Sequence, residues 1–175
     1  SCQKDPDGSA PDGNNLTLQV LLPVEGGTKA TEDGEKALNE NKISTLDVFI
    51  YKEGEDACAH YQRIVPVDGM TRYGISKNRS AFAENTGYSV YVVANAGTAA
   101  AGAMSLAELK AAVVAQALNP DAVQTDLLMD GKSIATVLND GTKANKNIDV
   151  SLKRGVAKIR VNLSYGADYQ PAGQV

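Results

Sequence analysis

The feature that most constrains the fold of this chain is a two-residue alternation of apolar and polar side chains. Between residues 16 and 22 every second position is apolar, and these positions are Leu16, Leu18, Val20 and Leu22. Successive side chains of a β-strand point to opposite faces, so the spacing predicts a half-buried strand whose apolar row faces the core. Pro23 follows directly, which is typical of a strand end or of an edge strand.

Several other segments have the length and composition of strands. Residues 88–94, YSVYVVA, are apolar on both faces, which indicates a central strand that is covered on both sides. The remaining predicted strands are residues 43–52, 61–67, 127–129, 134–138, 148–152 and 156–163. Turn residues such as Asp68-Gly69 separate these segments, as expected for a chain of short strands.

One segment has helical periodicity. Ser105 and Glu108 have the spacing of a capping box, in which each side chain accepts a hydrogen bond from a backbone N–H at the helix start. The apolar stripe of the predicted helix is Leu106, Leu109, Val113 and Leu118, and Pro120 ends it. About seven or eight strands and one short helix that do not alternate favour a mainly β fold, a two-sheet β-sandwich, over a βαβ architecture.

Composition limits the function. The 175 residues include 17 Lys+Arg and 21 Asp+Glu, and this net charge of −4 argues against a nucleic-acid partner. The sequence contains one His and no Trp, so a zinc site with two His cannot be built and a catalytic triad would have to use His60. No apolar run approaches the roughly 18 residues that span a bilayer.

The residues support little catalytic chemistry. Cys58 and His60 are two apart and would share one face of a strand, but an ordinary free thiol beside an exposed imidazole is the better explanation. A calcium loop that starts at Asp5 would need Glu at its twelfth position, where the sequence has Leu16. The common motifs for hydrolases, phosphate loops and dinucleotides are missing. We therefore expect no enzyme activity, no metal and no cofactor.

Residues 1–15, SCQKDPDGSAPDGNN, form a polar segment without the apolar side chains needed to pack, and we interpret it as a flexible tether. Cys2 at its head has the position of the lipid-modified cysteine of a bacterial lipoprotein, with Ser1 as the last residue before the cleaved bond of a signal peptide. An ordinary cysteine that happens to lie near the start is the alternative. A second polar stretch, residues 25–42, is long for a loop and indicates a functional or mobile segment.

The order of segments resembles the FimA-type fimbrillins, the pilin subunits of type V fimbriae, from about Leu16 to Tyr165. LTLQVLLPVEGGTKATEDGE is similar to the first strand and maturation loop of the family. ISTLDVFIYKEGE, YSVYVVANAG, the SLAELKAAV helix with LLMDG, and SLKRGVAKIRVNL follow in the family's order. No single motif is diagnostic, but the five together in this order are.

The resemblance implies a transthyretin-like sandwich and a structural pilin precursor that is held at the outer membrane by the acylated Cys2. A trypsin-like protease would then cut the loop behind the first strand, at Lys29 before Ala30, with Lys36 and Lys42 as rival sites. Loss of Leu16, Leu18, Val20 and Leu22 would uncover on the order of 6–12 kcal/mol of apolar contact, as an upper bound. A strand from another fimbrial subunit would fill the groove and form a homopolymer at the cell surface.

Two features depart from the family pattern. Family members carry Arg at the cleavage point, where this chain has Lys29, and they usually continue into a second domain that supplies the donor strand, whereas this sequence stops at Val175. We therefore expect a tether (1–15), one sandwich domain (16–165) and a linker or the start of a further segment (166–175).

The alternative function is a surface lipoprotein adhesin, or an accessory or tip subunit, that binds glycans or host proteins. Tyrosines at strand spacing can form a platform on which sugar rings stack, although such side chains more often belong to the core. The candidates for a platform are Tyr51, Tyr61, Tyr88 and Tyr91.

Overall fold

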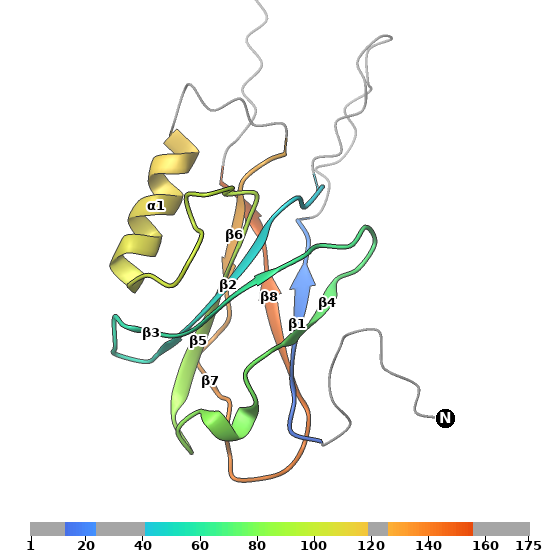
Figure 1. Ribbon diagram of the computed structural model, residues 1–175, viewed down its shortest axis with the longest axis vertical. Coiled ribbons are helices and arrows are strands. Elements are labelled where there is room, and N and C mark those ends of the chain that lie inside the picture. The colour runs from blue at the N-terminus through green and yellow to red at the C-terminus, as the bar shows by residue number, and fades with distance from the viewer. Residues whose placement is uncertain (1–12, 24–40, 119–125, 156–175) are drawn as a thin grey trace, which may run out of the picture.

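A small sheet packs face to face on a larger one in the computed structural model of this chain, which describes residues 13–23, 41–118 and 126–155 (Figure 1). The small sheet has the order β4-β1-β8. Its strands are β1 (Leu16–Leu21), β4 (Arg72–Ile75) and β8 (Lys146–Ser151). The first strand β1 is antiparallel to β4 and parallel to β8.

The larger sheet has six strands and only antiparallel pairs. Its order is β3-β2-β5-β6-β9, with β7 paired to β5 beside this path. The strands are β2 (Leu46–Lys52), β3 (Cys58–Ile64), β5 (Gly87–Ala94), β6 (Met129–Lys132), β7 (Thr136–Val137) and β9 (Lys153–Arg154). The remaining elements are a 3₁₀ turn η1 (Arg79–Ala81) and one helix α1 (Leu106–Leu118). The prediction of a mainly β fold with two sheets and one helix is confirmed.

Two apolar clusters divide the interior. The first lies between the sheets, and β1, β2, β5 and β8 all contribute alternate side chains to it. The second lies between the larger sheet and α1, where Phe49, Tyr51 and Val93 pack beneath Leu109. The central strand β5 supplies Val90 and Val92 to the first cluster and Val93 to the second, as the sequence predicts for a strand that is covered on both faces.

The helix begins as predicted. The Ser105 amide donates to the Glu108 carboxylate at 2.8 Å, and the Glu108 amide donates to the Ser105 hydroxyl at 3.2 Å. Asp56 adds a second cap, because its carboxylate accepts from the Ala107 amide at 2.9 Å. Leu109 is buried, but Leu118 is 75% exposed, so the expected apolar stripe does not reach the end of the helix.

Most predicted strands have different bounds in the structure; for example, the strands expected at 43–52 and 148–152 are β2 and β8. The strand expected at 61–67 is β3, which starts at Cys58 and ends at Ile64, because Val65 and Val67 lie in the exposed turn beyond it. The segments 127–129 and 134–138 become β6 and the two-residue β7. The prediction for residues 156–163 lies outside the described residues. The short strand β4 was not expected, since its four residues RYGI are too few for a periodic pattern.

Candidate functional site

The strand β1 lies in the middle of its sheet and ends at Leu21, so Pro23 follows a strand end and the alternative of an edge strand is wrong. Leu16, Leu18 and Val20 are each at most 1% exposed and pack in the cluster between the sheets. Leu22, which was expected to continue this row, lies beyond the strand end and is 37% exposed. Thr17, on the opposite face, is also buried, at 5% exposure.

Each edge of β1 is paired. Leu18 lies opposite Tyr73 of β4 and Ile148 of β8, and Leu16 lies opposite Ile75 of β4. The strands β4 and β8 do not pair with each other, because β1 lies between them. Removing β1 therefore leaves two unpaired strand edges with an apolar floor between them, formed by side chains of the larger sheet.

The two neighbours of β1 are held by contacts that do not involve β1. In β4, the Gly74 carbonyl accepts from the Gln62 side chain at 3.1 Å, which ties this strand to β3. The loop before β8 is held by Arg79, which is 2% exposed and donates to the Leu138 carbonyl at 2.7 Å and to the Asp140 carboxylate at 2.8 Å. The Thr142 hydroxyl and amide, together with Arg79, lower the pKa of the Asp140 carboxyl to about 2. These contacts hold β4 and β8 in place. The two strands form the walls of the space that β1 occupies, which we call the β1 slot.

Pro23 and Asn41, the nearest described residues on either side of the range 24–40, are joined by a hydrogen bond. The Asn41 side-chain amide donates to the Pro23 carbonyl at 3.3 Å, so the two ends of the segment between them lie together. The Asn41 side-chain oxygen accepts from Arg154 of β9 at 3.0 Å. The first strand is thus connected to the larger sheet through one side chain at this point.

Asn95, directly after β5, binds the chain just beyond this point. Its side-chain oxygen accepts from the Ser44 amide at 2.7 Å, and its side-chain nitrogen donates at 2.8 Å to the carbonyls of Lys42 and Leu127. Asn95 has a φ of 64°, a left-handed conformation that Asn tolerates better than most residues. Lys42 also forms an ion pair with Asp126 at 3.8 Å.

The other predicted processing residues, Cys2, Lys29, Ala30 and Lys36, lie outside the described residues. Lys42 alone among the candidate lysines is described, and both its carbonyl and its side chain have partners. Sequence reasoning missed Asn95, although an Asn after a strand of apolar residues is a common site of left-handed backbone.

Cys58 and His60 do not form a catalytic pair. The register between β2 and β3 shifts at Ile50 and Tyr51, and this bulge breaks the simple alternation that placed both side chains on one face. The Cys58 thiol packs in the cluster beneath α1 and donates to the His60 carbonyl at 3.2 Å. Burial raises the pKa of the Cys58 thiol and lowers the pKa of His60, so both groups favour their neutral forms.

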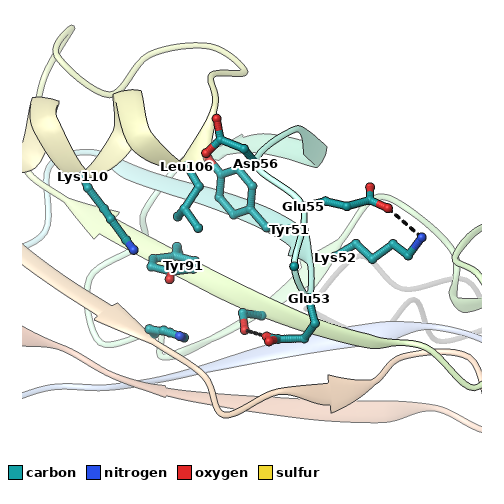
Figure 2. Close-up of a pocket in the computed structure, with 11 residues that line it drawn as sticks. Tyr51, Lys52, Glu53, Glu55, Asp56, Tyr91, Leu106 and Lys110 are labelled. Carbon is teal, nitrogen blue, oxygen red and sulfur yellow. Dashed lines mark hydrogen bonds and ion pairs between the residues drawn. The ribbon is translucent and has the colours of Figure 1, made fainter.

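The four tyrosines do not form a common platform. Tyr88 belongs to the cluster between the sheets, whereas Tyr51, Tyr61 and Tyr91 belong to the cluster on the helix side. Tyr51 and Tyr88 are core residues, at 1% and 4% exposure. Tyr91 is half-buried and lines a pocket beside the helix (Figure 2).

No group of three or more His, Cys, Asp or Glu side chains with metal-binding geometry occurs within residues 13–23, 41–118 and 126–155. The same ranges contain no helix that is both long and apolar enough to span a membrane.

The family model of the major fimbrial subunit protein (FimA) matches residues 15–164, which include β1 and every later described element. The chain belongs to the FimA major fimbrial subunit family. This confirms the resemblance that the order of segments indicates. The FimA family is one of structural fimbrial subunits, and membership confirms the expectation that the chain is not an enzyme.

The chain is also similar to solved bacterial proteins. A Parabacteroides distasonis protein assigned to cell adhesion has a TM-score of 0.50 and 15% identity, over 81% of this chain and 46% of that one. A fimbrilin (FimA) from Porphyromonas gingivalis has a TM-score of 0.48 and 18% identity, over 81% of this chain and 40% of that one. A P. distasonis fimbrial assembly protein has a TM-score of 0.45 and 17% identity, over 81% and 53%.

The chain therefore spans about half the length of these solved proteins, or less. No curated protein matches it. At such identities the structural likeness concerns the fold, and the family assignment comes from the match over residues 15–164.

Proposed function

We propose that this chain is the strand-accepting part of a fimbrial subunit, matured by removal of β1 and polymerised by insertion of a strand from another subunit. The observation that carries the proposal is the central position of β1, because its removal opens a slot with two unpaired edges instead of trimming a sheet margin. Family membership supports assembly with other fimbrial subunits at the cell surface, and a transthyretin-like sandwich over residues 16–165 as one domain.

The geometry of the slot supports strand insertion in either direction. Since β1 is antiparallel to β4 and parallel to β8, the two walls run in opposite directions. A strand that enters in the direction of β1 is antiparallel to β4, and one that enters the other way is antiparallel to β8. Either orientation satisfies the exposed N–H and C=O groups on both sides, while alternate apolar side chains fill the floor.

Proteolytic maturation is expected after Lys29, which would give a new N-terminus at Ala30. Lys42 is a poor site, because a protease must accept an extended segment, and the Lys42 carbonyl is held by Asn95 while its ammonium is held by Asp126. Limited trypsin digestion followed by mass mapping checks this. A first cut before Ala37 would transfer the role to Lys36.

The protection of Lys42 has its own test. Asn95→Asp keeps a side chain that tolerates positive φ but removes the N–H donors to Lys42 and Leu127, so cleavage after Lys42 should accelerate about fivefold. Asn85→Asp is the matched control, because Asn85 also has positive φ, at 50°, and is exposed. Equal Lys42 cleavage in both variants would contradict the protective role of Asn95.

Membrane attachment is expected to depend on Cys2. Acylation of this thiol would anchor the chain through the tether of residues 1–15, and Cys2→Ala removes the sulfur atom that would carry the thioether-linked lipid. When cells that express the full precursor are fractionated, the Cys2→Ala variant should be found in the soluble fraction instead of the membrane fraction. Cys58→Ala is the control, and membrane association of Cys2→Ala equal to that of this control would contradict the anchor.

A further inference from the structure

The pocket beside the helix is lined by residues on the helix side of the larger sheet, whereas β1 packs in the cluster on the other face of that sheet. Figure 1 shows α1 and β1 on opposite sides of the larger sheet. It has a volume of about 320 Å³, at the lower end of the range for small-molecule sites and sufficient for one sugar ring with its substituents. Its walls come from the end of β2 and the following turn, from β5, from β6 and from the first turns of α1. Strand exchange at β1 would leave these walls in place.

Tyr91 and Tyr51 form the aromatic part of the pocket. Their rings meet edge to face, with centroids 5.6 Å apart, and Tyr51 is 1% exposed. The Tyr51 hydroxyl donates to the Met104 carbonyl at 2.9 Å, which fixes that ring and leaves it unavailable for other hydrogen bonds as a donor. Tyr91 is half-buried, so its ring is the aromatic surface that a ligand can reach.

The carboxylates of the pocket already have partners. Glu55 forms an ion pair with Lys52 at 2.7 Å, and Glu53 accepts a hydrogen bond from the Ser89 hydroxyl. The Asp56 carboxylate caps α1 through the Ala107 amide. Each carboxylate still has oxygen lone pairs that can accept from a hydroxyl group, since an ionised carboxylate has about four acceptor positions.

Two of the three lysines that line the pocket have their side chains near the ring of Tyr91. Lys132 Nζ lies 5.5 Å from the centroid of the Tyr91 ring, and Figure 2 shows the Lys110 side chain descending from α1 toward the same ring. Neither ammonium forms an ion pair with another described residue. Two cations from different elements, α1 and β6, therefore lie near one aromatic ring.

We propose that this pocket binds a carboxylate-bearing sugar, such as a sialic or uronic acid residue of a glycan. Lys110 and Lys132 bind the carboxylate, the ring of Tyr91 contacts the apolar face of the sugar, and Glu53 and Asp56 accept from its hydroxyl groups. A polyanion is a poorer fit, because the three acidic side chains of the rim would repel additional negative charges.

The test is a titration of the full chain, before any cleavage, with 3′-sialyllactose and with lactose, followed by NMR or calorimetry. We expect millimolar or tighter binding of the acidic sugar and at least about tenfold weaker binding of lactose. Lys110→Gln and Lys132→Gln should each weaken binding of sialyllactose about tenfold, whereas Lys143→Gln, at an exposed lysine of the loop before β8, should leave it unchanged.

Three results would overturn the proposal. They are equal affinities for lactose and sialyllactose, equal affinities of the Lys110→Gln and Lys143→Gln variants, and binding of an acidic hexapeptide as tight as that of the sugar. Tyr91→Leu separates stacking from charge, because it keeps an apolar side chain but should still weaken sugar binding at least fivefold. The inference does not rest on strand exchange, since the experiment uses the chain with β1 in place.

Discussion

A chain that begins at Ala30, and so lacks β1, is expected to melt at a temperature lower by about 10 °C or more and to associate in solution. The three buried side chains of β1 contribute roughly 1.5–3 kcal/mol each, so their loss removes on the order of 5–9 kcal/mol as an upper bound. A domain of this size has a total stability of about 5–15 kcal/mol, and the truncated chain is left near the margin. Thermal denaturation and light scattering measure the two effects.

A peptide with the sequence of residues 14–23 should reverse both effects when it is added in trans. The peptide can restore the pairing with β4 and β8 and return Leu16, Leu18 and Val20 to the cluster between the sheets. The control is the same peptide with Asp in place of Leu18, which keeps every backbone hydrogen bond but cannot fill the floor. A donor strand from a type V pilin is expected to act like the first peptide.

Two outcomes would contradict the strand-accepting function. In one, the truncated chain remains monomeric and keeps the melting temperature of the full chain. In the other, the Asp-containing peptide restores the melting temperature and the monomeric state as well as the parent peptide does. That result would mean that binding in the β1 slot does not depend on the side chain at position 18.

The predicted elements were most accurate where a pattern is local. The capping box at Ser105 and Glu108 and the two-sided strand expected at 88–94 follow from spacing and composition, and the structure confirms both, the strand as β5. The alternation of β1 correctly placed Leu16, Leu18 and Val20, because a two-residue period fixes which face each side chain takes. It failed at Leu22, where the strand had already ended.

What the sequence could not supply depends on pairing between distant segments. The central position of β1 results from its parallel pairing with β8, which lies about 130 residues later, and no local pattern encodes that register. Asn95 is a second case, because its role comes from Ser44 and Leu127 lying close to the end of β5. The pocket at Tyr91 likewise requires α1 to cover the larger sheet where β6 pairs with β5.

Leu18→Asp in the intact chain is expected to destabilise the fold by at least about 4 kcal/mol at neutral pH, because it removes a fully buried side chain and introduces an unpaired buried charge. The matched control is Leu21→Asp, the same substitution three residues later on the same strand. Leu21 is 44% exposed, so this change should cost about 1 kcal/mol or less. Urea denaturation of the two variants measures the difference in the free energy of unfolding.

The pH dependence of Leu18→Asp separates the charge from the lost packing. Burial raises the folded-state pKa of the new carboxyl above its unfolded value of about 3.9. The carboxylate therefore binds a proton more tightly in the folded chain than in the unfolded chain. The deficit should therefore be largest well above that folded pKa and should shrink as the pH falls toward 4. Leu18→Asn, which has nearly the same shape without the charge, should show a deficit that does not change over this range. Equal deficits for Leu18→Asp and Leu21→Asp would mean that β1 does not occupy the register that places Leu18 between Tyr73 and Ile148.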